Sequence, residues 1–300
     1  MKEESGDWRE ESFVDEETAL APLRPRRARG ARVLVGTSGW SYKDWDGVFY
    51  PSGAKAADYL GHYGRVFRTV EIDATFYAMP RAQVVENWAR RAPEGFVFSA
   101  KFPRELTHEA RGLERLDLAH AFVERMGLLG EKRGPLLLQF PPGFLPDRLG
   151  ALDRFLEALP AEVRYAVEFR HPAWQHEETL AMLGARRAAW AAGVGPLNPP
   201  VRPLTTDFAY LRWIGDRSIE VFDRTQVERG EEIRRWAEWI ESVRDRLLEV
   251  YGYFNNHFAG HGPASARALL AALGEPAPLP PADEEPPPGA DERAQGELFG

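Results

Sequence analysis

Residues 33–51 read VLVGTSGWSYKDWDGVFYP and are the strongest indication of the fold in the chain. The short apolar run at 33–35 stops in a Gly/Ser turn, and the loop that follows carries two Trp, two Tyr, one Lys and two Asp. In α/β barrels, the active site is built from loops at the carboxyl ends of the strands. The stretch therefore predicts a first barrel strand followed by one wall of a site.

Strand and helix patterns alternate from this stretch to about residue 274. Strands are predicted at 32–38, 69–75, 96–101, 135–140, 164–170, 188–194, 208–214 and 249–255. Helices are predicted at 55–66, 81–91, 114–130, 147–158, 177–187, 230–247 and 263–273. This rhythm predicts a single α/β domain, a (β/α)8 TIM-type barrel, over residues 31–274. The pattern is weak at 188–205, where the strand is poor and no helix follows, so a doubly wound open sheet is the alternative.

The two ends of the chain differ in composition from this central region. Residues 1–30 change from acidic to Arg-rich without apolar periodicity, and residues 275–300 are acidic and rich in Pro. We predict that both tails are disordered. The formal net charge of −8 lies entirely in these tails, −2 in the first and −6 in the second, so the charges of residues 31–274 balance. A balanced body does not have the basic surface typical of proteins that bind duplex nucleic acid.

The chain contains no Cys, which excludes disulfides, thiolate metal sites and a Cys nucleophile. This composition suits a reducing compartment. No apolar run is long enough to span a bilayer, and the acidic N-terminus has no apolar signal core. We therefore predict a cytoplasmic protein without a membrane partner.

Polar residues recur on one face of the predicted strands. Because successive strand residues point to opposite faces, parity separates the apolar face from the polar one. If the apolar face packs on the helices, the polar face points into the barrel near its carboxyl end. This polar set comprises Glu71, Asp73, Thr75, Ser99, Lys101, Gln139, Glu168, Arg170, Arg212 and Asn255.

Six of these side chains are charged, and two interpretations remain open. Burying a charge costs several kcal/mol unless it is closely paired, so the set is either a closed ion-pair network or a polar site open to solvent. In the second case Glu71 and Glu168 are candidate acid and base groups. A glycosidase would use such a carboxylate pair, with Trp40, Trp45, Trp174 and Trp213 as sugar platforms. The alternative is that these Trp side chains are packing residues.

The loop after the last predicted strand, residues 255–263, reads NNHFAGHGP and leads into a helix. Glycines such as Gly260 at a helix N-terminus suit an anion, and phosphate sites of barrels often lie there. An ordinary Gly-rich connection is the alternative. Side chains in and near this region also suggest a divalent-metal site. The candidate ligands are Glu168, His171, Asp207, His257 and His261.

Seven segments carry a resemblance to a known family. They are VGTSGWSYKDWDGVFYP, EIDATFYAMP, FSAKFPRELTH, LLLQFPP, AVEFRHPAW, YLRWIGDR and VYGYFNNH, in this order along residues 32–272. Together they resemble the YecE-like family (domain of unknown function 72). The resemblance implies a TIM-type barrel with its site at the carboxyl end, and it supplies no reaction. At the sixth strand the chain has GVGPLNPPVRP where the family suggests an acidic or Ser-Pro motif.

The same resemblance implies a set of site residues, matched motif by motif. They are Trp40, Tyr42, Glu71, Thr75, Tyr77, Lys101, Gln139, Glu168, Arg170, Trp174, Arg212, Asn255 and Asn256.

The last residues of the second tail, 295–299, read QGELF. Gln295, Leu298 and Phe299 resemble the short peptide by which bacterial replication and repair proteins dock on the DNA sliding clamp. Gly296 stands where a hydrophobic residue would strengthen such docking. The alternative is a tail end without a partner.

Three functions follow as hypotheses. The first is an enzyme that acts on a phosphate-containing substrate, a small molecule or nucleic acid. In it Lys101, Arg170 and Arg212 hold the phosphate, and Glu71 or Glu168 is the general base. The second is the glycosidase. The third is a non-catalytic adapter that docks on the clamp. A cofactor is not predicted beyond the possible divalent metal.

Overall fold

The computed structural model describes residues 30–198, 201–215 and 218–278. The two predicted tails lie almost entirely outside these residues. Gln295, Leu298 and Phe299 are therefore also outside the described part of the chain.

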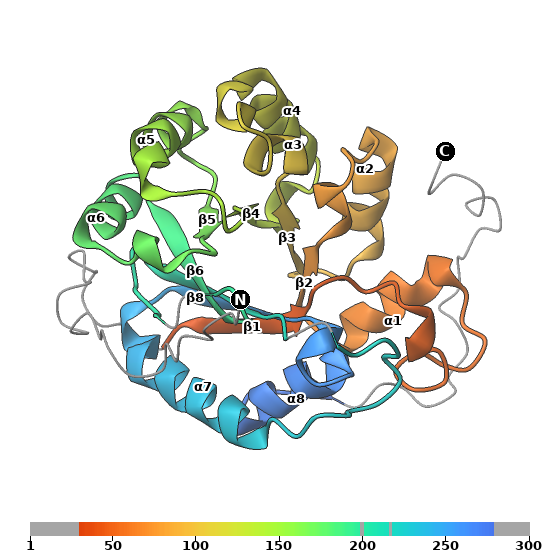
Figure 1. The fold of residues 1–300 in the computed structure, drawn as a ribbon. Coiled ribbons are helices and arrows are strands. Elements are labelled where there is room, and N and C mark those ends of the chain that lie inside the picture. The colour runs from red at the N-terminus through yellow and green to blue at the C-terminus, as the bar shows by residue number, and fades with distance from the viewer. Residues whose placement is uncertain (1–29, 199–200, 216–217, 279–300) are drawn as a thin grey trace, which may run out of the picture.

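Eight parallel strands form one nearly closed barrel (Figure 1). They are β1 (Arg32–Thr37), β2 (Thr69–Ile72), β3 (Val97–Lys101), β4 (Arg133–Gln139), β5 (Tyr165–Glu168), β6 (Ala188–Val194), β7 (Phe208–Trp213) and β8 (Glu249–Phe254). Their order is β1-β8-β7-β6-β5-β4-β3-β2. This order confirms the predicted TIM-type barrel. It excludes the doubly wound sheet, in which the strand order reverses at a switch point.

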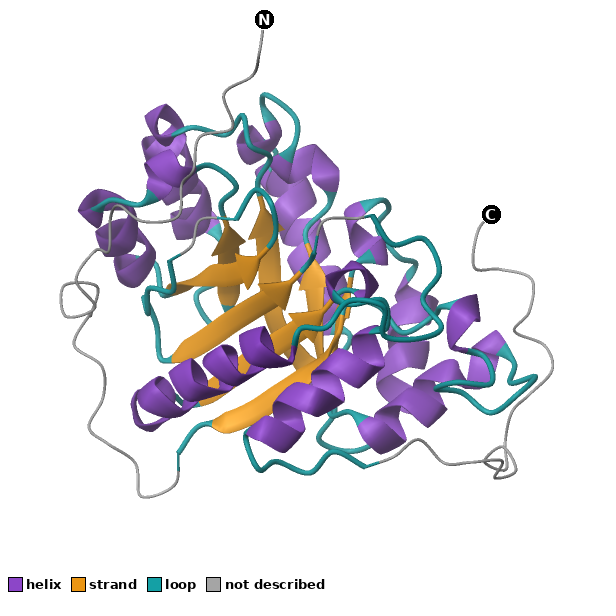
Figure 2. Cartoon of the chain, turned by 60° about the horizontal axis from the view of Figure 1, so that its bottom comes forward, coloured by secondary structure: helices purple, strands orange, loops and turns teal. Residues whose placement is uncertain are grey.

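Helices surround the strands on the outside, as Figure 2 shows from a second direction. They are α1 (Tyr59–Val66), α2 (Ala82–Arg91), α3 (Arg104–Thr107), α4 (Leu116–Gly127), α5 (Leu149–Ala158), α6 (Glu177–Ala185), α7 (Gly230–Val243) and α8 (Gly262–Ala272). The sixth strand forms and pairs with both neighbours despite its weak pattern. As the sequence indicated, the described residues between β6 and β7 contain no helix.

The barrel closes between β1 and β2 without a regular ladder. One bridge, Ser38 to Glu71, joins the two strands. Below it, the buried hydroxyl of Tyr63 on α1 accepts a hydrogen bond from the Thr37 amide at 2.9 Å and donates one to the Thr69 carbonyl at 3.0 Å. The phenol thus satisfies backbone groups that a ladder would otherwise pair.

Two apolar cores follow from strand parity. The larger core lies between the strands and the helices. The inner core fills the barrel with Leu34, Val97, Leu137, Ala166, Ala189, Ala191, Phe208, Tyr210, Tyr251 and Tyr253. Next to this core the interior contains polar groups. The Tyr253 hydroxyl lies 2.9 Å from Thr69 Oγ1 and 2.7 Å from Ser99 Oγ. Barrel interiors are usually filled by branched aliphatic residues.

None of the helices in the described residues is long and apolar enough to cross a bilayer.

Candidate functional site

Arg212 and Glu71 form an ion pair inside the barrel, near the carboxyl ends of the strands. Arg212, on β7, is 2% exposed, and Glu71, on β2, is fully buried. Arg212 Nε lies 2.9 Å from Glu71 Oε2, and Nη2 lies 2.8 Å from Oε1, a bidentate pair. The hydroxyls of Tyr210 and Ser38 donate to the same carboxylate, at 2.7 Å and 2.9 Å. Both oxygens of Glu71 are thereby engaged.

Glu168, at the end of β5, extends this pairing. Its Oε2 accepts from Arg212 Nη1 at 2.5 Å, and its Oε1 accepts from Arg170 Nε at 2.8 Å. Burial would raise the pKa of Glu168, but the charges and hydrogen bonds of Arg212 and Arg170 outweigh it and lower the pKa to about 2. Glu168 is therefore a carboxylate at neutral pH with little tendency to accept a proton.

Glu71, Glu168, Arg212 and Arg170 are called the buried ion-pair cluster below. Their geometry corresponds to the first interpretation of the charged strand ends, a network that connects strands across the barrel. It does not suit the roles that the phosphate hypothesis assigned to three of them. Arg212 is occupied by two carboxylates, and neither Glu71 nor Glu168 has the free oxygen that a general base needs.

A second group of side chains lies next to this network. We call Asp73, Phe76, Lys101 and His108, together with Arg170, the mouth cluster. Lys101 Nζ lies 3.6 Å from Asp73 Oδ1 and 3.8 Å from the centre of the Phe76 ring. The side chains are only partly closed off, being 8% exposed for Lys101, 15% for Arg170 and 33% for Asp73.

His108 follows α3 and was not among the predicted site residues. Its ring meets the Phe76 ring edge-on at 4.9 Å between centres. Desolvation and the charges of Lys101, Arg170 and Arg104 lower its pKa to about 4. His108 is the last residue of the quoted motif FSAKFPRELTH, seven residues after Lys101, and this position is the signal that could have identified it.

Four other predicted residues border the mouth cluster. Thr75 is buried, and its hydroxyl donates to the Lys101 carbonyl at 2.7 Å, which fixes the end of β3. Gln139 is buried on β4, in register with Glu168. The Tyr42 hydroxyl donates to the Ser38 carbonyl at 2.7 Å, and burial raises its pKa, helped by the charges of Asp73 and Glu71. Tyr77 is 72% exposed beside Phe76.

The predicted Trp platforms are packing residues. Trp45, Trp174 and Trp213 are fully buried. Trp174 Nε1 donates to the Phe144 carbonyl at 2.7 Å, and its ring stacks on Phe169 at 4.3 Å. No face of the Trp174 ring is open in this structure, so the geometry does not support the ligand-binding role predicted for it. Trp40 is partly buried and packs edge-on against Trp88 of α2 at 5.7 Å.

The loop after β8 does not offer the backbone donors that were expected. Gly260 N donates to the Asn256 carbonyl at 2.7 Å, and Gly262 N donates to Asn256 Oδ1 at 2.9 Å. Gly260 has φ +105°, and a Cβ there would lie 2.5 Å from the Arg224 carbonyl oxygen. Asn255 Oδ1 accepts from His257 N at 3.1 Å. These hydrogen bonds stabilise the loop itself, so they do not support the anion site predicted at Gly260 or the ligand role predicted for Asn256.

The predicted metal ligands do not converge. Asp207 precedes β7, at the amino end of the barrel, whereas Glu168 lies at the carboxyl end of β5. His171 Nδ1 accepts a hydrogen bond from the Ala173 amide at 3.1 Å. In the part of the chain that the structure describes, no three His, Asp or Glu side chains are arranged to hold a metal ion.

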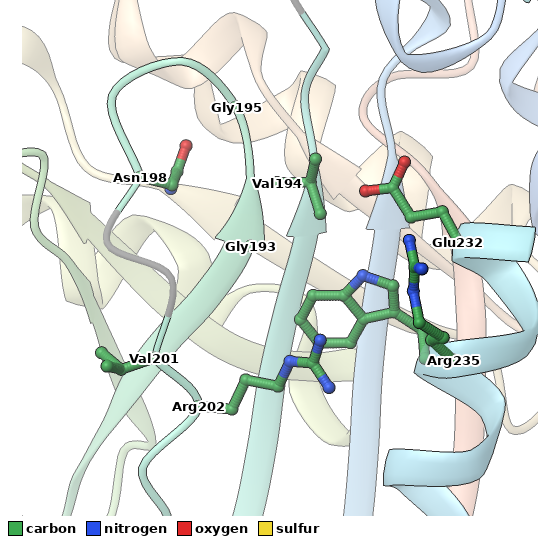
Figure 3. Close-up of a pocket in the computed structure, with 9 residues that line it drawn as sticks. Gly193, Val194, Gly195, Asn198, Val201, Arg202, Glu232 and Arg235 are labelled. Atoms are coloured by element: carbon green, nitrogen blue, oxygen red, sulfur yellow. The ribbon is translucent and has the colours of Figure 1, made fainter. Parts of the chain in front are cut away.

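A cavity of about 240 Å³ lies away from these groups, beside α7 (Figure 3). It is lined by Gly193, Val194, Gly195, Asn198, Val201, Arg202, Glu232, Arg235 and Trp236. Its lining residues come from the end of β6, the segment that follows it and the first half of α7. The Arg202 guanidinium lies 4.0 Å from the centre of the Trp236 ring. None of the predicted site residues lines it.

A parallel, nearly closed barrel with its charged side chains at the carboxyl end defines a TIM-type barrel protein. Within this class, a sequence model of the family described as "Protein of unknown function DUF72" matches residues 34–290, so the chain belongs to that family. The resemblance predicted from the motifs is confirmed.

Individual relatives agree with this membership. The chain is 36% identical to the UPF0759 protein YecE of Escherichia coli K12 over 152 residues, 49% of this chain and 53% of that protein. The match thus spans about half the length of that relative. The chain is 24% identical to the UPF0759 protein YunF of Bacillus subtilis 168 over 274 residues, 80% of this chain and 94% of that protein.

Solved structures of the family have the same fold. A DUF72 family protein of Thermotoga maritima MSB8 has a TM-score of 0.69 and 30% identity, covering 81% of this chain and 100% of that chain. One from Enterococcus faecalis V583 has a TM-score of 0.67 and 19% identity, covering 82% of this chain and 99% of that chain. The second likeness concerns the fold alone.

Proposed function

We propose that the mouth cluster binds a small phosphate-bearing ligand and that the protein is an enzyme acting on such a ligand. The observation that carries this proposal is the grouping of partly closed-off cations, Lys101 and Arg170, with the unpartnered Oδ1 of Asp73. The low pKa of His108, about 4, is consistent with it. Beyond desolvation, three cations depress it: Lys101, Arg170 and Arg104. Positive charge around a partly buried group of side chains is the electrostatic setting that an anion requires.

Arg170 is the group that would hold the phosphate, and Lys101 adds positive charge nearby. Arg170 Nε donates a hydrogen bond to Glu168 Oε1. Within the described residues its two terminal nitrogens make no hydrogen bond, so they are available for bidentate contact with phosphate oxygens. Glu168 and Arg212 hold Arg170 in place rather than contact the ligand themselves.

Asp73 replaces Glu71 and Glu168 as the proposed general base. Its Oδ1 is buried, and among the described residues it has no hydrogen-bond partner. It has only longer ion-pair contacts, at 3.6 Å to Lys101 and 3.9 Å to Arg212. A carboxylate with a free oxygen beside a phosphate site is placed to activate water or a hydroxyl group.

The burial of Lys101 favours a small ligand, or the end of a single nucleic-acid strand, over duplex nucleic acid. The side chain of Lys101 is only 8% exposed, so a ligand must enter the carboxyl end of the barrel to reach Nζ. The exposed Tyr77 ring, 72% accessible, lies beside Phe76 and offers a surface on which a base can stack.

Phosphate titration followed by calorimetry tests this proposal with the full chain. Inorganic phosphate and a nucleoside monophosphate are expected to bind, and Arg170→Ala is expected to weaken both by at least about tenfold through loss of a charge-assisted contact. Arg234→Ala, at an exposed ion pair on α7, is the matched control and is expected to bind like the unchanged protein. Equal affinity of all three proteins would refute the proposal.

The glycosidase hypothesis gains no support from the geometry. Glu71 and Glu168 are both engaged by Arg212, and three of the four Trp side chains proposed as platforms are fully buried. Docking on a sliding clamp through Gln295, Leu298 and Phe299 remains a proposal that rests on the motif in the sequence.

A further inference from the structure

Lysine is rare in this chain, and one lysine lies in the mouth cluster. Of the 38 basic residues, five are lysines, namely Lys2, Lys43, Lys55, Lys101 and Lys132. The other cations around the mouth cluster are Arg104, Arg170 and Arg212. A guanidinium stays protonated in proteins, whereas a buried lysine can lose its proton and act as a nucleophile. Lys101 therefore has a chemical capacity that its cationic neighbours do not have.

The surroundings of Lys101 Nζ differ from those of a structural lysine. In the described part of the chain Nζ makes no hydrogen bond, and its contacts are Asp73 Oδ1 at 3.6 Å and the Phe76 ring centre at 3.8 Å. Lys132 provides the contrast, because its Nζ donates to the carbonyls of Ala89 and Ala92 at 2.6 Å each. The amine of Lys101 is therefore buried, and it donates no hydrogen bond to an acceptor in the described residues.

The surroundings of Lys101 also make its ammonium group easier to deprotonate. Burial lowers the pKa of Lys101, and the charge of Arg212 lowers it further, while Asp73 and Glu168 oppose the shift. Desolvation next to another cation is a recognised way to activate a lysine for attack on a carbonyl carbon.

We propose that Lys101 forms an imine with a small aldehyde or ketone whose phosphate group is held by Arg170. This inference rests on the proposed phosphate site and names its substrate class as phosphorylated carbonyl compounds. The carbonyl end would reach Nζ between Phe76 and Asp73, while the phosphate faces Arg170 and His108.

The reaction balances with groups already present. Asp73 takes the proton of the ammonium, and the nitrogen lone pair then forms the C–N bond while the carbonyl π electrons move to oxygen. The oxygen gains a proton, and the nitrogen of the resulting carbinolamine loses one. Asp73 returns a proton to the hydroxyl group, which leaves as water as the C=N bond forms. The ammonium group and the carbonyl compound thus give a protonated imine and water, and no oxidant or metal is needed.

Borohydride trapping tests the inference. The full-length protein is incubated with glycolaldehyde phosphate, reduced with sodium borohydride, digested, and mapped by mass spectrometry. We expect a secondary amine at Lys101 in at least about tenfold excess over the adduct at Lys132 or at any other lysine. Lys132→Arg is the matched control and is expected to keep the adduct at Lys101. Lys101→Arg and Lys101→Met are expected to lose it, and their melting curves show whether both variants fold.

The outcomes separate this inference from the proposed function. If Lys101 carries no excess adduct while inorganic phosphate still binds, the imine is refuted and the phosphate site stands. If unphosphorylated glycolaldehyde labels Lys101 as well as its phosphate ester does, and inorganic phosphate does not compete, Lys101 is the nucleophile but the phosphate-bearing substrate class is wrong. Preferential labelling by the ester, suppressed by inorganic phosphate, supports both.

Discussion

Arg212 was predicted to hold a phosphate, and in the structure its guanidinium is paired with two carboxylates. Its guanidinium bridges Glu71 on β2 and Glu168 on β5 from its own strand β7, all three side chains being buried. Removing one partner of such a pair leaves an unpaired buried charge, which is strongly destabilising. At the residue scale, the ion-pair cluster therefore serves to hold the strands and to orient Arg170.

Acid stability depends on Glu168. Its pKa is about 2 in the folded protein against the ordinary 4.5. A depressed carboxyl pKa contributes stability above pH 4.5, and that contribution is lost as the pH falls through 2. At about 1.4 kcal/mol per pKa unit it amounts to about 3 kcal/mol. We expect Glu168→Gln to flatten the decline of the unfolding free energy between pH 5 and pH 2, measured by urea titration. An unchanged slope would contradict the assignment.

His108 reports the positive potential of the mouth cluster. Because desolvation and nearby cations lower its pKa to about 4, the ring is neutral at pH 7. We expect Lys101→Met to raise the midpoint of the His108 ring titration, followed by NMR, since one of those cations is removed. Lys55→Met, at an exposed lysine, is the control substitution and is expected to leave the His108 midpoint unchanged. A midpoint for His108 that does not move would argue against an anion site here.

At the scale of elements, the junction between β1 and β2 is where the barrel is least regular. Tyr63 of α1 bonds to the backbone of both strands through its hydroxyl. Close approach is required as well, since a Cβ on Gly36 would lie 2.1 Å from the Thr69 carbonyl oxygen. The helix and the glycine together close the barrel where only one bridge joins the strands.

Removing that hydroxyl tests its role. Tyr63→Phe leaves the Thr37 amide and the Thr69 carbonyl buried without this partner, so we expect a loss of about 1–3 kcal/mol in unfolding free energy. Tyr59→Phe is the control on the same helix, because no side-chain hydrogen bond of its hydroxyl connects the two strands in the described residues. Equal losses in the two variants would show that Tyr63 contributes by packing alone.

At the scale of the whole molecule, the periodicity of strands and helices sufficed to predict the barrel. The period of two also predicted which face of each strand is polar, because a residue's face follows from its position alone. The loops were less predictable. Whether Trp174 faces solvent, or whether the Gly260 amide is free, depends on contacts with Phe144 and Asn256 that no local pattern reveals.

The sequence was sufficient to predict which charged residues lie at the site, but not which of them pair with one another. Glu71 and Arg212 are 141 residues apart in sequence, and so the saturation of the carboxylate could be seen only once the strands were placed. His108 was missed because it follows a short helix rather than ending a strand, and parity does not apply there. Asp73 was recognised as polar-facing, and its free oxygen became evident only beside its neighbours.

Docking of the tail peptide on a sliding clamp is a prediction about how the whole protein assembles with a partner. If Gln295, Leu298 and Phe299 dock on a bacterial sliding clamp, a pull-down of the clamp with the full chain is expected to succeed. The double substitution Leu298→Ala and Phe299→Ala is expected to abolish capture by removing the apolar anchors. Arg293→Ala, just before the motif, is the control. Capture that survives the double substitution would eliminate this docking peptide.

The central claim, that the mouth cluster is a phosphate site, is tested most directly by a crystal structure of the protein soaked with glycolaldehyde phosphate. We expect tetrahedral density within hydrogen-bond distance of the terminal nitrogens of Arg170, with the carbon end next to Lys101 Nζ. Phosphate density beside Arg202 and Arg235 at the α7 cavity, or no density at Arg170 with the ligand in large excess, would contradict the claim.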